Sequence, residues 1–300
     1  MSIINDEIHV HIASPARIIN LGIHDFPRLS TLYFNSYLIP NIHMFPNEII
    51  KHCSLLPDNI PRPVITFIFN RFTKKFIKID VNNYIINNEA LEYDTERVKQ
   101  LFNYYDIKHK DSHKWVEYWM TKVNIICAEI LKDVPNMIFR AYDGPTESSV
   151  FSSYKGYYTT DKTKKHNMFG DFGELYTHAT SPLRRYVDYY VHQLLYNYEM
   201  SKNDIKMSID LINEQSRLFK RAQNEIEMVK RFNEYRGKVI RNVIAEYDKD
   251  LNVWFCPNYN IMLYNVEFYE TVKDKLLILN GTYKVNLHVM DNYKILLELC

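Results

Sequence analysis

The segment from Tyr176 to Asp188 constrains the fold most, because it indicates where a helix begins and which charged groups lie at its start. Ser181 can cap the free amide groups of a helix, and Pro182 suits the first helical position, where a missing N–H costs nothing. Apolar and aromatic residues then recur at helical spacing as far as Tyr198. The sequence therefore predicts a helix that starts at Ser181-Pro182 and carries Arg184 in its first turn.

Periodicity predicts the elements on either side of this segment. Ile8, Val10 and Ile12 alternate with polar residues, which is typical of a half-buried strand. Apolar positions from Ser112 onward recur at helical spacing until Pro135 ends the pattern. We expect strands over residues 7–12, 63–70 and 76–81, helical potential over 93–105, and helices over 112–134 and 208–232.

The pattern changes at Tyr235, where short β-like runs separated by Asn, Asp and Gly replace the helical stripes. Such runs favour a small β-barrel of the oligonucleotide-binding kind. We therefore expect two domains, a mixed α/β domain over residues 1–234 and a small β-rich domain over residues 235–300.

Charge and composition exclude several classes of function. The 37 basic and 36 acidic side chains nearly cancel, so any contact with nucleic acid must be local. A Gly-rich phosphate loop is absent, and the four cysteines form no C-x-x-C pair, which argues against a zinc site or a disulfide framework. No run approaches the roughly 20 apolar residues that cross a bilayer. We expect a soluble intracellular protein with no membrane partner.

The segment Tyr176–Asp188 reads Y-T-H-A-T-S-P-L-R-R-Y-V-D and resembles the signature of the ribonuclease II (RNB-domain) family, Y-x-H-F-T-S-P-I-R-R-Y-x-D. The tail is similar in position to that family's terminal S1-type barrel. Further matches, in the family's order, are Val10-His11-Ile12-Ala13, residues 33–40, Cys53-Ser54-Leu55 with Arg62, residues 86–93, Val116-Glu117 with Met120 and Asn124, and Arg140 with Pro145.

The resemblance implies a 3'-to-5' exoribonuclease that acts on single-stranded RNA with Mg²⁺. The implied fold is an RNB-type central sheet with packed helices, followed by a small S1/OB-like barrel. Arg184 is implied to contact the scissile phosphate, Tyr33 to stack on a base, and Glu117 to lie near the terminal nucleotide. Arg185 and His178, which lie within the signature, are further candidates for RNA contact.

Each of these roles has a structural alternative. Arg184 and Asp188 are four residues apart on the expected helix and could form an ion pair with each other. Tyr33 could belong to the core, because the chain has 24 tyrosines. A single glutamate such as Glu117 on an amphipathic helix commonly faces solvent. His178 could simply pack or form a hydrogen bond.

The departures from the family concern the metal site. Family members carry clustered aspartates just before the V-H-I-A strand, because Mg²⁺ requires oxygen ligands. This chain has only Asp6 and Glu7 there, and Ser14 occupies the place of the family's next aspartate. We expect this chain alone to bind no metal. Three readings stay open: an incomplete gene product, a degenerate homologue that binds RNA or protein, and a split enzyme completed by a partner chain or larger assembly. The degenerate or truncated homologue is favoured.

Overall fold

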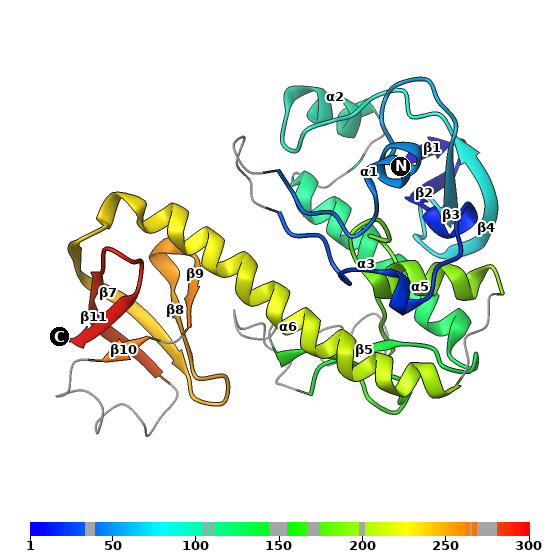
Figure 1. Ribbon diagram of the computed structural model, residues 1–300. Helices are drawn as coiled ribbons and strands as arrows, with labels where there is room; N and C mark the ends of the chain where they lie inside the picture. The colour runs from blue at the N-terminus through cyan, green and yellow to red at the C-terminus, as the bar shows by residue number, and fades with distance from the viewer. Residues whose placement is uncertain are drawn as a thin grey trace. The chain divides into compact units, whose positions relative to one another are not determined.

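The computed structural model describes residues 1–33, 40–104, 107, 111–143, 155–166, 175–197, 202–264, 266–268 and 281–300. Residues 34–39 and Pro145, which belong to the matched segments, lie outside the described residues. Internal contacts divide the chain into two compact units (Figure 1). The first comprises Met1–Thr31, Ile42–Glu147 and Gly156–Gln215, and the second comprises Leu32–Asn41, Ser148–Lys155 and Ser216–Cys300.

The first unit contains an antiparallel sheet in the order β1-β2-β3-β4, formed by β1 (Ser2–Ile4), β2 (Glu7–Ala13), β3 (Arg62–Asn70) and β4 (Phe76–Ile85). Strand β2 buries alternate residues, as its sequence predicts. Strand β3 is buried along nearly its whole length, which accounts for its continuous apolar run. The predicted strands are therefore confirmed, and β4 extends beyond its predicted end.

Helices pack against this sheet and supply the rest of the core. Helix α3 is confirmed with its predicted start, and the Asp111 carboxylate caps it by accepting the Lys114 N–H at 3.1 Å. The fully buried Trp119 of α3 lies against Phe69 of β3, with 4.8 Å between ring centroids. The helices of this unit are α1 (Asn47–Cys53), α2 (Glu96–Tyr104), α3 (Ser112–Leu131), α5 (Tyr186–Leu195) and the first part of α6 (Lys202–Phe232).

The predicted helix start at Ser181-Pro182 is wrong, because α5 begins at Tyr186. The Arg184 and Arg185 amides both donate to the Ser181 carbonyl at 3.1 Å, which closes a turn. Arg185 is then extended and forms an isolated antiparallel bridge with Ser30. Beside it, the Thr31 amide donates to the Arg184 carbonyl and the Tyr186 amide donates to the Leu29 carbonyl, each at 3.0 Å. Because residues 184–186 pair with residues 29–31, which are distant in the sequence, the helix begins at Tyr186.

The segment predicted to be rich in β-structure, residues 235–300, supplies the strands of the second unit, which also includes the part of α6 from Ser216 onward. Its sheet has the order β10-β12-β11-β7-β8-β9, and no closed barrel is formed within the described strands. Phe232, at the end of α6, packs into the core of this sheet. The strands are β7 (Lys238–Asp248), β8 (Val253–Cys256), β9 (Ile261–Leu263), β10 (Glu267–Phe268), β11 (Gly281–Val289) and β12 (Ile295–Leu299). The chain as described is a mixed α+β protein.

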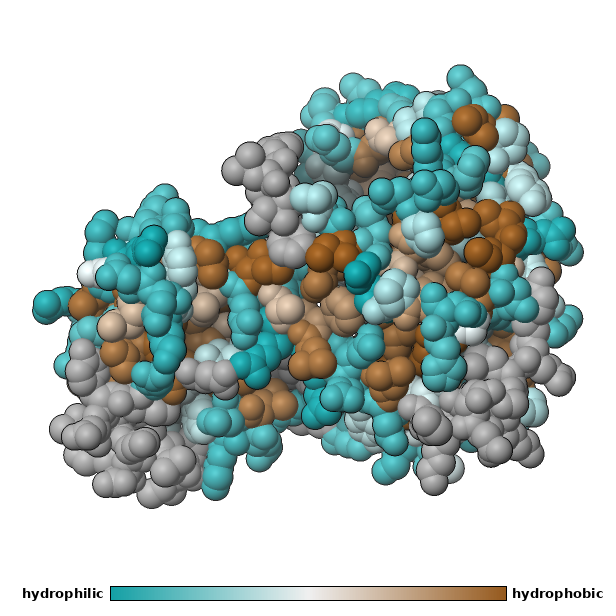
Figure 2. Space-filling view, in the orientation of Figure 1, coloured by the Kyte–Doolittle hydropathy of each residue, from teal (hydrophilic) through white to brown (hydrophobic). Residues whose placement is uncertain are grey.

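The surface is polar with scattered apolar patches. On the face drawn in Figure 2, hydrophobic residues lie in separate groups between hydrophilic ones, which is normal for a folded protein. Two aromatic side chains in the first unit are far more exposed than that pattern requires, Phe72 at 69% and Tyr104 at 80%. Among the helices that the structure describes, none combines the length and apolar character needed to cross a membrane.

Candidate nucleic-acid interface

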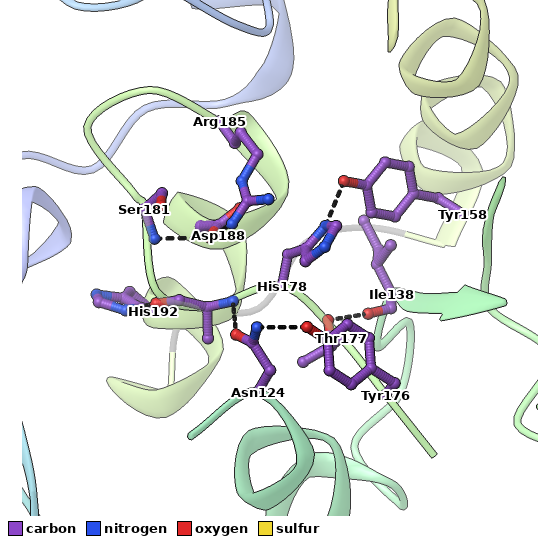
Figure 3. A network of polar contacts seen from close by, with 11 residues as sticks. Asn124, Ile138, Tyr158, Tyr176, Thr177, His178, Ser181, Arg185, Asp188 and His192 are labelled. Atoms are coloured by element: carbon purple, nitrogen blue, oxygen red, sulfur yellow. Dashed lines mark hydrogen bonds and ion pairs between the residues drawn. The ribbon is translucent and has the colours of Figure 1, made fainter. Parts of the chain in front are cut away.

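The turn formed by residues 181–185 is held by hydrogen bonds to one buried carboxylate, that of Asp188. Asp188, fully buried in the first turn of α5, accepts the Ser181 N–H at 2.7 Å and the Arg185 Nη2 at 2.8 Å through the same oxygen, Oδ1 (Figure 3). The ion pair that the sequence allowed for Arg184 is therefore made by Arg185. The Arg184 side chain itself is exposed at the surface of the turn.

The charge on Arg185 is largely compensated within the protein. Burial disfavours its charged form, but the Asp188 carboxylate beside it keeps the pKa of Arg185 above its usual value. The other oxygen of the carboxylate, Oδ2, is buried and accepts no hydrogen bond from the described residues. Arg185 is the cation that pairs with Asp188, so loss of either partner would leave the charge of the other unpaired in a poorly solvated site.

Tyr158 contacts Arg140 and lies within electrostatic range of Arg185, Asp188 and Arg184. The positive charges of Arg140, Arg185 and Arg184 each favour ionisation of the Tyr158 hydroxyl, although burial has the larger effect and raises its pKa. The Arg140 guanidinium lies 4.8 Å from the centre of the Tyr158 ring. The Tyr158 hydroxyl in turn hydrogen-bonds His178 Nδ1 at 2.7 Å (Figure 3). The predicted candidates Arg184, Arg185 and His178 thus all interact with Tyr158, as does the negative charge of Asp188.

Arg140 is a contact of Tyr158 that the sequence did not single out as a site residue. It is 7% exposed, and burial lowers its pKa, with the nearby charge of Arg185 acting in the same direction. Gly156 packs directly against it, because a Cβ at that position would lie 2.7 Å from Arg140 Nη2. The only sequence signal was the family match of Arg140 itself, which carried no assigned role.

Asn124 of α3 forms two hydrogen bonds with the segment that precedes the turn, residues 176–180. Its Nδ2 donates to the Tyr176 hydroxyl at 2.8 Å, and its Oδ1 accepts the Ala179 N–H at 2.8 Å (Figure 3). The Thr177 hydroxyl donates to the Ile138 carbonyl at 2.6 Å. These buried contacts fix the backbone on both sides of His178, so the motif asparagine serves the site by positioning it.

Ser14, which occupies the place of a family aspartate, lies in the core. It is fully buried, and its Oγ lies 2.9 Å from His192 Nδ1. His192 Nε2 faces the Ala179 carbonyl at 2.8 Å, so Nε2 carries the proton and Nδ1 accepts one from Ser14. Burial lowers the pKa of His192 to about 4, which keeps this pair neutral. Ser14 therefore supports the same segment as Asn124.

The remaining predicted candidates are Glu117 and Tyr33. Glu117 is exposed on α3. Tyr33 is half-buried and belongs to the second unit, where its amide donates to Gln223 Oε1 of α6 at 3.0 Å. Its carbonyl accepts the Gln223 Nε2 at 2.5 Å, so the backbone of Tyr33 is fixed locally.

The carboxylates and histidines of the described residues do not form a magnesium cage. No three His, Cys, Asp or Glu side chains gather there at metal-binding range. Of the two acids before the V-H-I-A strand, Asp6 is exposed and Glu7 bonds His9 at 2.9 Å. Hard divalent cations need several oxygen ligands at once, so this donor set does not fit the metal.

Comparisons with known proteins report the fold. No protein-family model matches the chain, and no curated protein matches it. The apo form of Mycoplasma genitalium RNase R superposes with a TM-score of 0.63 at 14% identity, covering 98% of this chain and 67% of that one. The Dss1 exoribonuclease of Candida glabrata gives 0.60 at 14% identity, covering 97% and 50%. Yeast Ssd1, a pseudonuclease, gives 0.60 at 13% identity, covering 86% and 46%.

Proposed function

We propose that this chain is an RNB-family protein related to 3'-to-5' exoribonucleases, and that it binds single-stranded RNA while its metal-dependent catalysis is impaired. The observation that carries the proposal is the turn of residues 181–185, which presents the exposed Arg184 and is held by the buried Asp188 carboxylate through Ser181 and Arg185. The shared fold supports it, because the similar structures include RNase R, one structure of which is a complex with double-stranded RNA, and the pseudonuclease Ssd1.

Arg184 is the residue that we assign to the RNA phosphate. Its side chain is exposed, and its backbone is fixed by the turn and by the pairing with Thr31. A guanidinium presents a planar fork of N–H donors that matches two phosphate oxygens. Arg140 is buried and Asp188 compensates the charge of Arg185, so Arg184 is the one of the three arginines whose side chain is exposed to a ligand. Such an arrangement can hold a phosphodiester in one orientation.

The same residues do not supply a nucleophile. Hydrolysis in this family depends on metal-activated water, and the described carboxylates do not fit that role. Ser14 is engaged with His192 in the core, so it is not a substitute ligand. We therefore assign binding of RNA to this chain and not its cleavage. A non-catalytic subunit of a larger RNA-processing assembly, or a chain whose metal ligands come from a partner, is the alternative.

We also infer that the β-rich unit is an OB-type barrel. Strands β9 and β10 are neighbours in the sequence, yet they lie at opposite ends of the strand order. If β9 and β10 act as one bent strand, every strand has two partners, with β10 pairing parallel to β12 and β9 pairing antiparallel to β8. That connectivity suits a small barrel that binds oligonucleotides. It would supply a second RNA-binding surface.

The binding proposal is tested with fluorescein-labelled single-stranded RNA and fluorescence anisotropy over a series of salt concentrations. Arg184→Ala should weaken binding about tenfold or more, because it removes a charge-assisted hydrogen bond, and should lower the salt slope by about 0.7. Arg97→Ala is the matched control, because Arg97 is an exposed arginine whose charge is balanced by Glu89 at 3.0 Å. Equal affinity of the Arg184→Ala and Arg97→Ala variants would refute the assignment.

The catalytic state is tested on the same RNA with Mg²⁺ added. We expect binding without shortening of the labelled strand. Stepwise shortening that Arg184→Ala abolishes would overturn the pseudonuclease assignment in favour of the exonuclease. Absence of binding even at low salt, where phosphate contacts are strongest, would instead favour a role in protein contacts.

A further inference from the structure

The turn between β3 and β4 carries a group of cationic and aromatic side chains that the proposed phosphate contact at Arg184 does not use. It comprises Arg71, Phe72, Lys74 and Lys75 of the turn together with Lys122 of α3, and we call it the hairpin patch. Phe72 is 69% exposed, and the Arg71 guanidinium lies 5.8 Å from the centre of its ring. Placing an apolar ring at the tip of a solvent-exposed hairpin has a cost with no compensating contact in the core.

The turn is held in one conformation by its own hydrogen bonds. Asn70 Oδ1 accepts the Phe72 amide at 3.0 Å, and the Thr73 amide and hydroxyl at 2.8 and 3.0 Å. The Lys74 amide donates to the Asn70 carbonyl at 2.9 Å, and the Arg71 amide donates to the Asp6 carbonyl at 2.7 Å. The patch is therefore preorganised, which reduces the entropy that a ligand must offset on binding.

The cations of the patch lie close enough to repel one another. Lys74 Nζ lies 5.4 and 5.8 Å from the ring centres of Trp115 and Trp119. Lys122 Nζ donates to the Lys74 carbonyl at 3.1 Å. Burial lowers the pKa of Lys74, and the charges of Arg71 and Lys122 lower it further. Because this repulsion is built into the folded protein, a bound anion would relieve it.

A small cavity of about 240 Å³ opens among these side chains. Thr73, Lys74, Lys75 and Lys122 supply its polar lining, and Phe76 is among its apolar residues. Phe72 does not line the cavity, but it precedes the lining residue Thr73 in the same turn. Ammonium groups around a cavity and an exposed aromatic ring on the same turn match the two needs of a single nucleic-acid strand: charge along the backbone and a face on which a base can stack. An acidic peptide would use the ammonium groups but would gain little from the ring.

We propose that the hairpin patch is a second contact site for single-stranded RNA, in which Phe72 stacks on a base and Lys74, Lys75 and Lys122 surround the adjoining phosphate. This inference rests on the proposed function, since it assigns a further site for the same ligand. It concerns residues outside the signature, on the turn of the β3–β4 hairpin and on α3.

The test uses the full chain and labelled single-stranded RNA. Phe72→Ala should weaken binding about fivefold or more, since it removes one stacked base. Tyr104→Ala is the matched control, as Tyr104 is an even more exposed aromatic residue of the same unit. Lys75→Gln should lower the salt slope by about 0.7, with Lys99→Gln, an exposed lysine near Glu96 at 3.6 Å, as the control. Thermal unfolding confirms that each variant folds.

The outcomes separate the two proposals. Weaker binding in Phe72→Ala and Lys75→Gln, with unchanged controls, supports the hairpin patch. If Arg184→Ala weakens binding while the two patch variants match wild type, the hairpin patch is refuted and the proposed function stands. If Lys75→Gln weakens binding of polyglutamate as much as of RNA, and Phe72→Ala weakens neither, the patch binds acidic protein segments and the RNA assignment fails. If no variant or wild-type protein binds RNA, both proposals fail.

Discussion

Replacement of Asp188 by Asn tests how much the negative charge of this side chain contributes to holding the turn of residues 181–185. The amide oxygen can still accept from Ser181 and Arg185, so the main change is the loss of one negative charge at a fully buried position. Removal of one partner from a buried ion pair costs about 3–5 kcal/mol. The Arg185 side chain is 22% exposed, so water compensates in part, and we place the loss at the lower end, about 3 kcal/mol.

Urea unfolding followed by circular dichroism measures this loss for Asp188→Asn, Arg185→Met and the double variant. The double variant should be more stable than the sum of the single effects predicts, because it contains no unpaired charge, with a coupling energy above about 1.5 kcal/mol. Asp188→Asn should also weaken RNA binding, since the turn presents Arg184. A loss below about 0.5 kcal/mol with no coupling would refute the argument that this ion pair holds the turn.

Three further predictions concern the support of the same segment. Asn124→Ala should destabilise the protein by about 2–4 kcal/mol, because the Tyr176 hydroxyl and the Ala179 amide both lose buried partners; a change within error in urea unfolding would contradict this. His192, whose pKa burial lowers to about 4, should contribute stability that is present above about pH 6.5 and declines as the pH falls toward 4, by up to about 1.4 kcal/mol per pH unit. His192→Gln should flatten that part of the stability profile, and an unchanged slope would exclude the histidine as its source. Ser14→Asp should raise the pKa of His192, measured by NMR, without creating Mg²⁺-dependent RNA hydrolysis; hydrolysis in this variant would show that Ser14 occupies a metal-ligand position after all.

Local sequence patterns predicted the elements that are determined by which of their own faces is buried. The alternation of Ile8, Val10 and Ile12 indicated β2, and helical spacing indicated α3, because both patterns report burial of one face. The start of α5 depended on a different cause. Its first backbone groups pair with residues 29–31, which are remote in sequence, so capping residues alone led to the wrong boundary.

The candidate site shows the same division. The signature indicated Arg184, Arg185 and His178 as candidates, which stays a prediction. Helical spacing offered an Arg184–Asp188 ion pair as the structural alternative, but Arg185 makes that pair because the chain forms a turn where a helix was expected. Arg140 joins them from strand β5 (Phe139–Ala141), through a contact that no local pattern could report. Gly156 packs against the Arg140 guanidinium, but it could have indicated the place of Arg140 only if the two residues were already known to be neighbours.

The structure gives a physical reason why RNA binding could outlast catalysis in such a chain. The turn of residues 181–185 is held by Asp188. The segment before it is held by Asn124 and by the neutral pair of Ser14 and His192. None of these side chains belongs to a group of three or more potential metal ligands within the part of the chain that the structure describes. Loss of metal-binding carboxylates would remove the nucleophile while the groups that position Arg184 stayed in place, because their energies come from buried hydrogen bonds and one ion pair. If the chain binds RNA as proposed, substitutions at Asp188 and Asn124 should therefore impair that binding, even though the proposal places neither side chain in contact with the RNA.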